Sequence, residues 1–143
     1  MSESKEHREL VMRLARDLAT RYPTVSLTTD IQEKPGDSTP GLISGYRPDI
    51  YASVKSQGLC IICEAKTTND LDNSHTNLQL RSFSAYLETH SRGLLVLGIS
   101  GEGADRAKTI LRFMAKELSP KVTTLQLFDG LDYWELRQTW HLL

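Results

Sequence analysis

The chain has 143 residues and a formal net charge of −1, and it is 39% hydrophobic and 24% charged. This composition is typical of a globular protein, and the length predicts that residues 1–143 form a single domain. A protein that wraps nucleic acid tightly usually has a basic excess, which is missing here, although an enzyme with acidic metal ligands need not show one. With no apolar run near the roughly 20 residues of a membrane helix and a polar start, we expect a cytoplasmic protein that does not bind membranes.

The first half of the chain predicts one helix followed by three strands. Apolar residues recur at three- and four-residue spacing over residues 4–21, which is typical of an amphipathic helix. Residues 24–32 and 49–55 alternate between apolar and polar side chains, as half-buried strands do. Residues 59–66 are almost continuously apolar and predict a central strand covered on both faces. Residues 34–48 hold three of the five prolines and predict a long loop.

The second half continues with alternating helices and strands. Residues 75–90 and 103–118 have the spacing of amphipathic helices, and residues 93–99 form a second wholly apolar strand. Residues 122–128 and 132–138 read as a final pair of strands around an Asp-Gly turn. The predicted order is therefore α-β-β-β-α-β-α-β-β. We expect an α/β protein with a central mixed β-sheet flanked by helices.

The stretch "LCIICEAKT" at residues 59–67 contains both cysteines of the chain, Cys60 and Cys63. Side chains alternate along a strand, so two cysteines three positions apart face opposite sides of the sheet. A zinc site of this kind needs its pair on a tight turn and a second ligand pair elsewhere, and a redox pair needs a helix N-terminus. We therefore predict that Cys60 and Cys63 are buried and serve packing.

Glu64 and Lys66 share one face of the same strand and stand at its polar end. If Gln57 and Gly58 form a two-residue turn, Asp49 on the preceding strand lies opposite Lys66. Asp49, Glu64 and Lys66 would then converge on one side of the sheet. This convergence depends on the register that the turn sets.

Two carboxylates beside an ammonium group are suited to a hard divalent cation. Mg²⁺ prefers one or two carboxylates together with water and phosphate oxygens, and a neighbouring lysine can orient the attacking water. The chemistry that fits is hydrolysis of a phosphodiester. Spacing alone leaves an alternative open, which is an ordinary ion pair between Lys66 and Asp49 or Glu64.

Pro48-Asp49, followed after fourteen residues by Glu64-Ala65-Lys66, resembles the signature of the PD-(D/E)xK nucleases. The predicted elements over residues 4–100 also resemble the α-β-β-β-α-β core of that superfamily, the restriction-endonuclease-like fold. The resemblance implies that Asp49 and Glu64 bind Mg²⁺, for which Mn²⁺ can substitute, that the carbonyl of Ala65 completes the metal shell, and that Lys66 is catalytic. It implies an endonuclease acting on branched or otherwise structured DNA, near the archaeal-type Holliday-junction resolvases or the RecB-like nucleases.

Many members of the superfamily add a glutamate from the first helix, where this chain offers Glu3, Glu6 and Glu9. On a helical wheel Glu9 points away from the apolar face, Glu6 lies at its edge and His7 lies in its centre. Glu6 is therefore favoured as a further metal ligand, although His7 stands where the family's glutamate would be placed. The alternative is that Glu6 belongs to a solvated helix start.

Gln79 is a further candidate catalytic residue, because RecB-like members carry Gln-x-x-x-Tyr on the helix after the ExK motif. Here Phe83 stands in place of the tyrosine, so a packing role for Gln79 remains the alternative. Several basic residues are candidates to flank the cleft and hold backbone phosphates. They are Lys34, Arg47, Lys55, Arg81 and Arg92.

The sequence thus predicts a Mg²⁺-dependent deoxyribonuclease whose partner is DNA. We expect it to act as a homodimer or within a larger complex, because closed two-fold pairs are the commonest oligomers. Two other readings stay open. One is a catalytically inactive nuclease-fold subunit that binds nucleic acid or a protein partner, and the other is an α/β interaction domain in which the motif is accidental.

Overall fold

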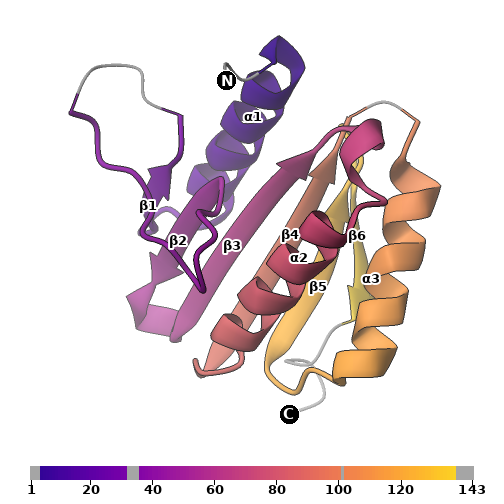
Figure 1. Ribbon diagram of the computed structural model, residues 1–143. Helices are drawn as coiled ribbons and strands as arrows, with labels where there is room; N and C mark the ends of the chain where they lie inside the picture. The colour runs from indigo at the N-terminus through magenta and orange to yellow at the C-terminus, as the bar shows by residue number, and fades with distance from the viewer. Residues whose placement is uncertain (1–3, 32–35, 101, 138–143) are drawn as a thin grey trace.

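The computed structural model describes residues 4–31, 36–100 and 102–137 (Figure 1). Its elements, in chain order, are α1 (Lys5–Arg21), β1 (Ser26–Thr29), β2 (Ile50–Val54), η1 (Lys55–Gln57), β3 (Leu59–Lys66), η2 (Thr68–Asp70), α2 (Ser74–Leu87), β4 (Arg92–Ile99), α3 (Ala104–Leu118), β5 (Thr123–Phe128) and β6 (Tyr133–Arg137). None of the helices within these ranges is long and apolar enough to cross a membrane.

The strands form one six-stranded mixed sheet in the order β1-β2-β3-β4-β5-β6. β3, β4 and β5 run parallel, and the other neighbouring pairs are antiparallel. α1 covers one face of the sheet, while α2 and α3 cover the other (Figure 1). The predicted α/β class, with a mixed sheet flanked by helices, is confirmed.

The alternation of side chains along β3 divides the apolar interior into two cores. Ile61 and Cys63 belong to the core under α1, and Cys60 and Ile62 belong to the core under α2 and α3. Both cysteines are buried and free, as predicted. Burial raises the pKa of the Cys63 thiol, which keeps it protonated and unreactive.

Gly98 on β4 allows α1 to lie close to the sheet. A Cβ atom at this position would stand 2.9 Å from Leu14 Cδ1 on α1, so a larger residue would press against the helix. Gly98 also pairs with Ala65 at the end of β3. The close approach therefore fixes the position of α1 near the motif that the sequence singles out.

The hairpin between β2 and β3 has a different turn from the predicted one. Val54 pairs with Leu59, and four residues, 55–58, connect the strands through the 3₁₀ turn η1. Gly58 ends this turn with φ 61°, a left-handed conformation that suits glycine. The two-residue turn predicted at Gln57-Gly58 is therefore wrong, and the register differs by two residues. A shift of two preserves the face of every side chain, so Asp49 comes to lie next to Glu64 instead of Lys66.

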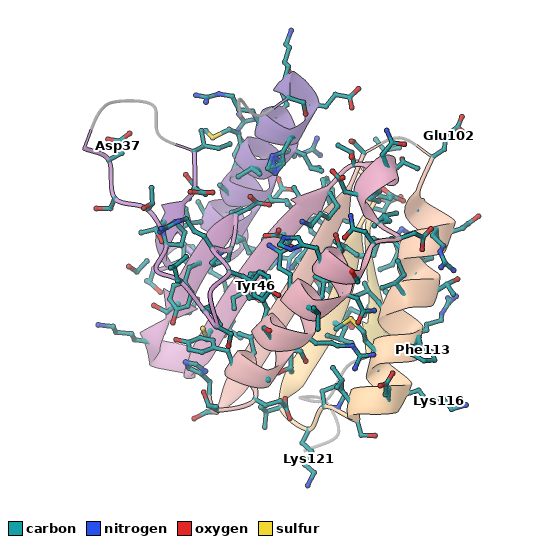
Figure 2. The ribbon with its side chains drawn as sticks, viewed as in Figure 1. Asp37, Tyr46, Glu102, Phe113, Lys116 and Lys121 are labelled. Carbon is teal, nitrogen blue, oxygen red and sulfur yellow. The ribbon has the colours of Figure 1, made fainter. Side chains whose placement is uncertain are left out.

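The segment at residues 36–48 has no regular strand, as predicted, but it packs against the α2 side of the sheet. Ile43 and Tyr46 exchange two backbone hydrogen bonds around a tight turn at Ser44 and Gly45. Ile43 is buried in the α2 core, and the Tyr46 ring stands edge-on to His75 with 5.3 Å between centroids. Figure 2 shows Tyr46 beside α2. These contacts hold the chain just ahead of Asp49 in place.

Candidate active site

The candidate site lies where β3 ends and β2 begins. β3 ends at Lys66, and because β2 is antiparallel to it, the residue that precedes β2 stands beside this end. That residue is Asp49, which is 6% exposed, and its neighbour Glu64 is 3% exposed. Two carboxyl groups are thus buried side by side, an arrangement that proteins rarely keep without a compensating partner.

Two hydrogen bonds fix the carboxyl groups to each other's strands. The backbone N–H of Asp49 donates to Glu64 Oε1 at 3.1 Å, and the backbone N–H of Ala65 donates to Asp49 Oδ2 at 2.8 Å. The two side chains are therefore locked by main-chain groups and do not depend on flexible partners. This geometry preorganises a site that holds two acidic groups at a defined separation.

Lys66 completes the group that the sequence predicts. Its Nζ atom lies 3.2 Å from Glu64 Oε2, and its side chain is 14% exposed. Asp49, Glu64 and Lys66 therefore converge, as expected, and the ion pair between Lys66 and Glu64 that was the alternative is also present. The two readings do not exclude each other, because the same ammonium group can pair with Glu64 and face a substrate.

Burial dominates the protonation of the two carboxyl groups. Burial raises the pKa of Glu64 well above its usual value, and the neighbouring Asp49 carboxylate raises it further, while Lys66 lowers it. The pKa of Asp49 is also raised by burial, against the lowering effects of the Ala65 N–H and His7. The pair therefore holds a proton more tightly than isolated carboxyl groups do. A positive charge placed between them would release it.

His7 is the first-helix residue that reaches the site. Its Nε2 atom lies 3.2 Å from Asp49 Oδ2, and its side chain is 20% exposed. Glu6 is exposed and makes no ion pair or hydrogen bond with any residue in the described ranges, and Glu9 pairs with Lys5 in solvent at 3.9 Å. Glu3 lies outside the described residues. Glu6 as a metal ligand stays a prediction, whereas His7 is in contact with Asp49.

The residues present fit a divalent cation that is held mainly by oxygen. Within the described ranges, no group of three or more His, Cys, Asp and Glu side chains is arranged to hold a metal ion. A site built on Asp49 and Glu64 would therefore use two carboxylates, with main-chain carbonyl and water oxygens completing the shell, which is the pattern that Mg²⁺ prefers. Transition metals that demand several imidazole or thiolate ligands fit less well.

Gln79 on α2 is a buried polar residue. Gln79 on α2 is 6% exposed, and its Oε1 atom is buried without a hydrogen-bond partner among the described residues. Its catalytic role stays a prediction.

Two threonines follow β3 directly. Thr67 Oγ1 donates to Asp70 Oδ2 at 2.9 Å, and Thr68 Oγ1 donates to the carbonyl of Ser100 at 3.4 Å. Both hydroxyl groups thus have partners within the protein.

Two of the basic residues proposed to flank the cleft lie far from it. Lys55 in η1 and Arg92 at the start of β4 stand at the opposite end of the strands from Lys66. Arg81 pairs with Glu117 at 2.7 Å, and Arg47 donates to the carbonyl of Pro40 within its own loop. Lys34 lies outside the described residues. Lys55 and Arg92 therefore do not flank the carboxyl pair. Arg47, two residues ahead of Asp49, also pairs with Asp30 at 3.9 Å, and its role at the site stays a prediction.

Comparison with known proteins identifies no relative. No family model, no curated protein and no solved structure matches the chain. The resemblance to the PD-(D/E)xK nucleases therefore depends on the motif residues Asp49, Glu64, Ala65 and Lys66 and on the order of the elements that carry them.

Proposed function

We propose that the protein is a Mg²⁺-dependent nuclease of the PD-(D/E)xK type, which hydrolyses DNA phosphodiester bonds as an endonuclease on branched or otherwise structured DNA. The observation that carries the proposal is the pair of buried carboxyl groups, Asp49 and Glu64, with the Lys66 ammonium 3.2 Å from Glu64. The order α1-β1-β2-β3-α2-β4, with the motif on the β2–β3 hairpin, supports a restriction-endonuclease-like core.

In this proposal the side chains have distinct roles. Asp49 and Glu64 would hold the cation, which supplies Lewis-acid stabilisation of phosphate oxygens and lowers the pKa of bound water. Lys66 donates hydrogen bonds to the attacking water or to a non-bridging phosphate oxygen, where negative charge develops as the phosphodiester is cleaved. His7 contacts Asp49 Oδ2 and positions that carboxylate.

The proposal predicts metal-dependent cleavage that requires Asp49. With Mg²⁺ or Mn²⁺, the wild-type protein is expected to cut at least one member of a panel of branched, single-stranded and duplex DNAs, and EDTA is expected to stop the reaction. The Asp49→Ala protein is expected to cut at least about 1,000-fold more slowly. Gel assays of labelled substrates measure both rates. Equal cutting by the two proteins, or none by either, would refute the proposal.

A second candidate function is a nuclease-fold subunit that binds nucleic acid without cutting it. The observation in its favour is that both Glu64 oxygens already have partners, the Asp49 N–H on Oε1 and the Lys66 ammonium on Oε2. A cation at this site must displace or share at least one of them. The same panel separates the two functions, because the non-cutting subunit would retain DNA in a mobility-shift assay with no cleavage at any metal concentration.

A further inference from the structure

A groove runs along the outer side of the sheet layer that α2 and α3 form, where the two helices lie side by side (Figure 1). One hollow of about 580 Å³ lies towards the start of the helices, and a second of about 170 Å³ lies towards their ends. We call the two together the α2–α3 groove. Its walls contain five large apolar side chains, Leu71, Leu78, Ile110, Phe113 and Leu118.

The apolar side chains of this groove are unusually exposed. Three of the six large apolar residues that are exposed within the described ranges belong to it. Phe113 is 60% exposed and projects outward from α3 (Figure 2), and Leu78 on α2 is 55% exposed. Single exposed apolar side chains are common, but a group that lines one groove with a polar rim is typical of a protein interaction surface.

Two ion pairs cross the α2–α3 groove. Near its start, Asp72 on the α2 side pairs with Arg106 of α3 at 2.6 Å. Further along, Arg81 of α2 pairs with Glu117 of α3 at 2.7 Å. The acidic partner thus stands on the α2 side at one end and on the α3 side at the other. Each of these four corners therefore has the opposite charge to the corner across the groove and to the corner along it.

This pattern of charges is complementary to itself. α2 and α3 run in the same direction, because each connects two parallel strands. A two-fold axis along the helices places the α2 side of one copy on the α3 side of the other, at the same end. An axis across the helices places the two ends of the same side together. In both arrangements every acidic corner meets a basic one, as the closed two-fold pairing of identical surfaces requires.

The same balance of charge disfavours other occupants of the groove. With two acidic and two basic corners, it lacks the basic excess that attracts nucleic acid or an anionic membrane. A further acidic residue in its lining, Glu88, accepts hydrogen bonds from the backbone N–H groups of Lys121 and Val122, at 2.7 and 3.0 Å. That carboxylate is therefore held by the chain itself and does not act as a fifth corner.

We infer that the α2–α3 groove is the interface of a homodimer, in which Leu78 and Phe113 of the two copies pack together inside a rim of ion pairs. The partner that the surface fits is a second copy of this chain. The inference does not depend on the proposed nuclease function. Two helices from each copy form a small interface, so we expect a reversible dimer with a Kd on the order of 10 µM.

Sedimentation velocity tests the inference with the wild-type chain in EDTA and without DNA. Protein concentrations from about 1 to 300 µM bracket the expected Kd. Phe113→Glu is expected to raise the Kd at least about 30-fold, the effect of losing a central apolar anchor. Leu42→Glu is the matched control, because Leu42 is also 60% exposed but does not line the groove. It should keep the wild-type Kd.

Two charge variants test the self-complementary rim. Arg81→Glu/Arg106→Glu makes all four corners acidic, and Asp72→Lys/Glu117→Lys makes them all basic. Each variant alone is expected to dimerise at least about tenfold more weakly than wild type, because like charges then meet across either two-fold axis. An equimolar mixture should form a heterodimer at least about tenfold more tightly than either variant self-associates. Recovery in the mixture would also show that both variants are folded.

Two results would overturn the inference. A wild-type protein that stays monomeric at about 300 µM would mean that a different partner, or none, covers the groove. A wild-type dimer that persists unchanged in Phe113→Glu and in both charge variants would place the interface on another surface. Neither result bears on the proposed nuclease function, because the measurement contains no DNA and no divalent cation.

Discussion

Replacement of Lys66 by methionine is expected to reduce kcat for DNA cleavage about 100- to 1,000-fold, the effect of removing one donor from a preorganised charge-stabilising site. Methionine keeps the length of the side chain without the ammonium group that lies 3.2 Å from Glu64. Binding of Mn²⁺ is expected to persist or to strengthen, because a positive charge beside the carboxyl pair has been removed. Loss of catalysis with retained cation binding would assign Lys66 to the reaction itself.

Lys55→Met is the matched control for this substitution. Lys55 is an exposed lysine of the same hairpin, but it stands in the turn at the opposite end from Lys66. It is expected to keep the wild-type kcat. Cleavage rates measure the effect on kcat, and isothermal titration calorimetry with Mn²⁺ measures the effect on cation binding. A Lys66→Met protein with an unchanged kcat would show that the lysine only pairs with Glu64.

Replacement of Glu64 by glutamine is expected to raise stability in EDTA at neutral and alkaline pH. Burial raises the pKa of Glu64 in the folded protein above its unfolded value, so the native state binds the proton more tightly than the unfolded state does. Stability from this group is present below the unfolded pKa and is lost as the pH rises through the folded pKa. Glutamine does not ionise and therefore avoids this loss of stability. The gain in stability over the wild type should shrink as the pH falls towards 4.5, the ordinary pKa of glutamate.

The same variant is expected to lose stabilisation by divalent cations. A cation that binds only the native state at about 100 times its Kd stabilises it by about 2.7 kcal/mol, which is on the order of 10 °C in Tm for a chain of this length. Glu64→Gln should show little of this shift. Thermal unfolding with and without Mn²⁺ measures both effects.

Glu102→Gln is the control for the cation effect, because Glu102 is exposed and projects into solvent (Figure 2). It should show the full wild-type shift with Mn²⁺. An equal Mn²⁺ shift in Glu64→Gln and wild type would mean that the cation binds elsewhere. A lower Tm for Glu64→Gln than for wild type in EDTA at pH 8 would mean that the ion pair with Lys66 outweighs the cost of burying the carboxylate.

The elements were predictable from the sequence because their apolar periodicity is strong. β3 has the predicted bounds, residues 59–66, and its polar end carries the site as expected. The turn before it was not predictable. The general preference of hairpins for a two-residue turn did not hold here, because residues 55–57 form a 3₁₀ turn that ends at Gly58. Asp49 still reaches Glu64, since a register error of two residues leaves each side chain on its own face.

The contact between His7 and Asp49 depends on how α1 packs on the sheet. The local sequence pattern did not determine which residue of α1 reaches the site. The helical wheel places His7 in the centre of the buried face of α1, and that face packs on the sheet beside β3 and β4. The position of His7 on the helical wheel therefore indicated that it faces the sheet, but a preference for a carboxylate as metal ligand favoured Glu6.

The most direct test of the central claim is anomalous scattering from a crystal of the protein with Mn²⁺. We predict one strong peak in contact with the carboxylates of Asp49 and Glu64, and no peak at this position in crystals of the Asp49→Asn protein. A well-ordered site without anomalous density between these two carboxylates, at Mn²⁺ concentrations that support cleavage, would contradict it.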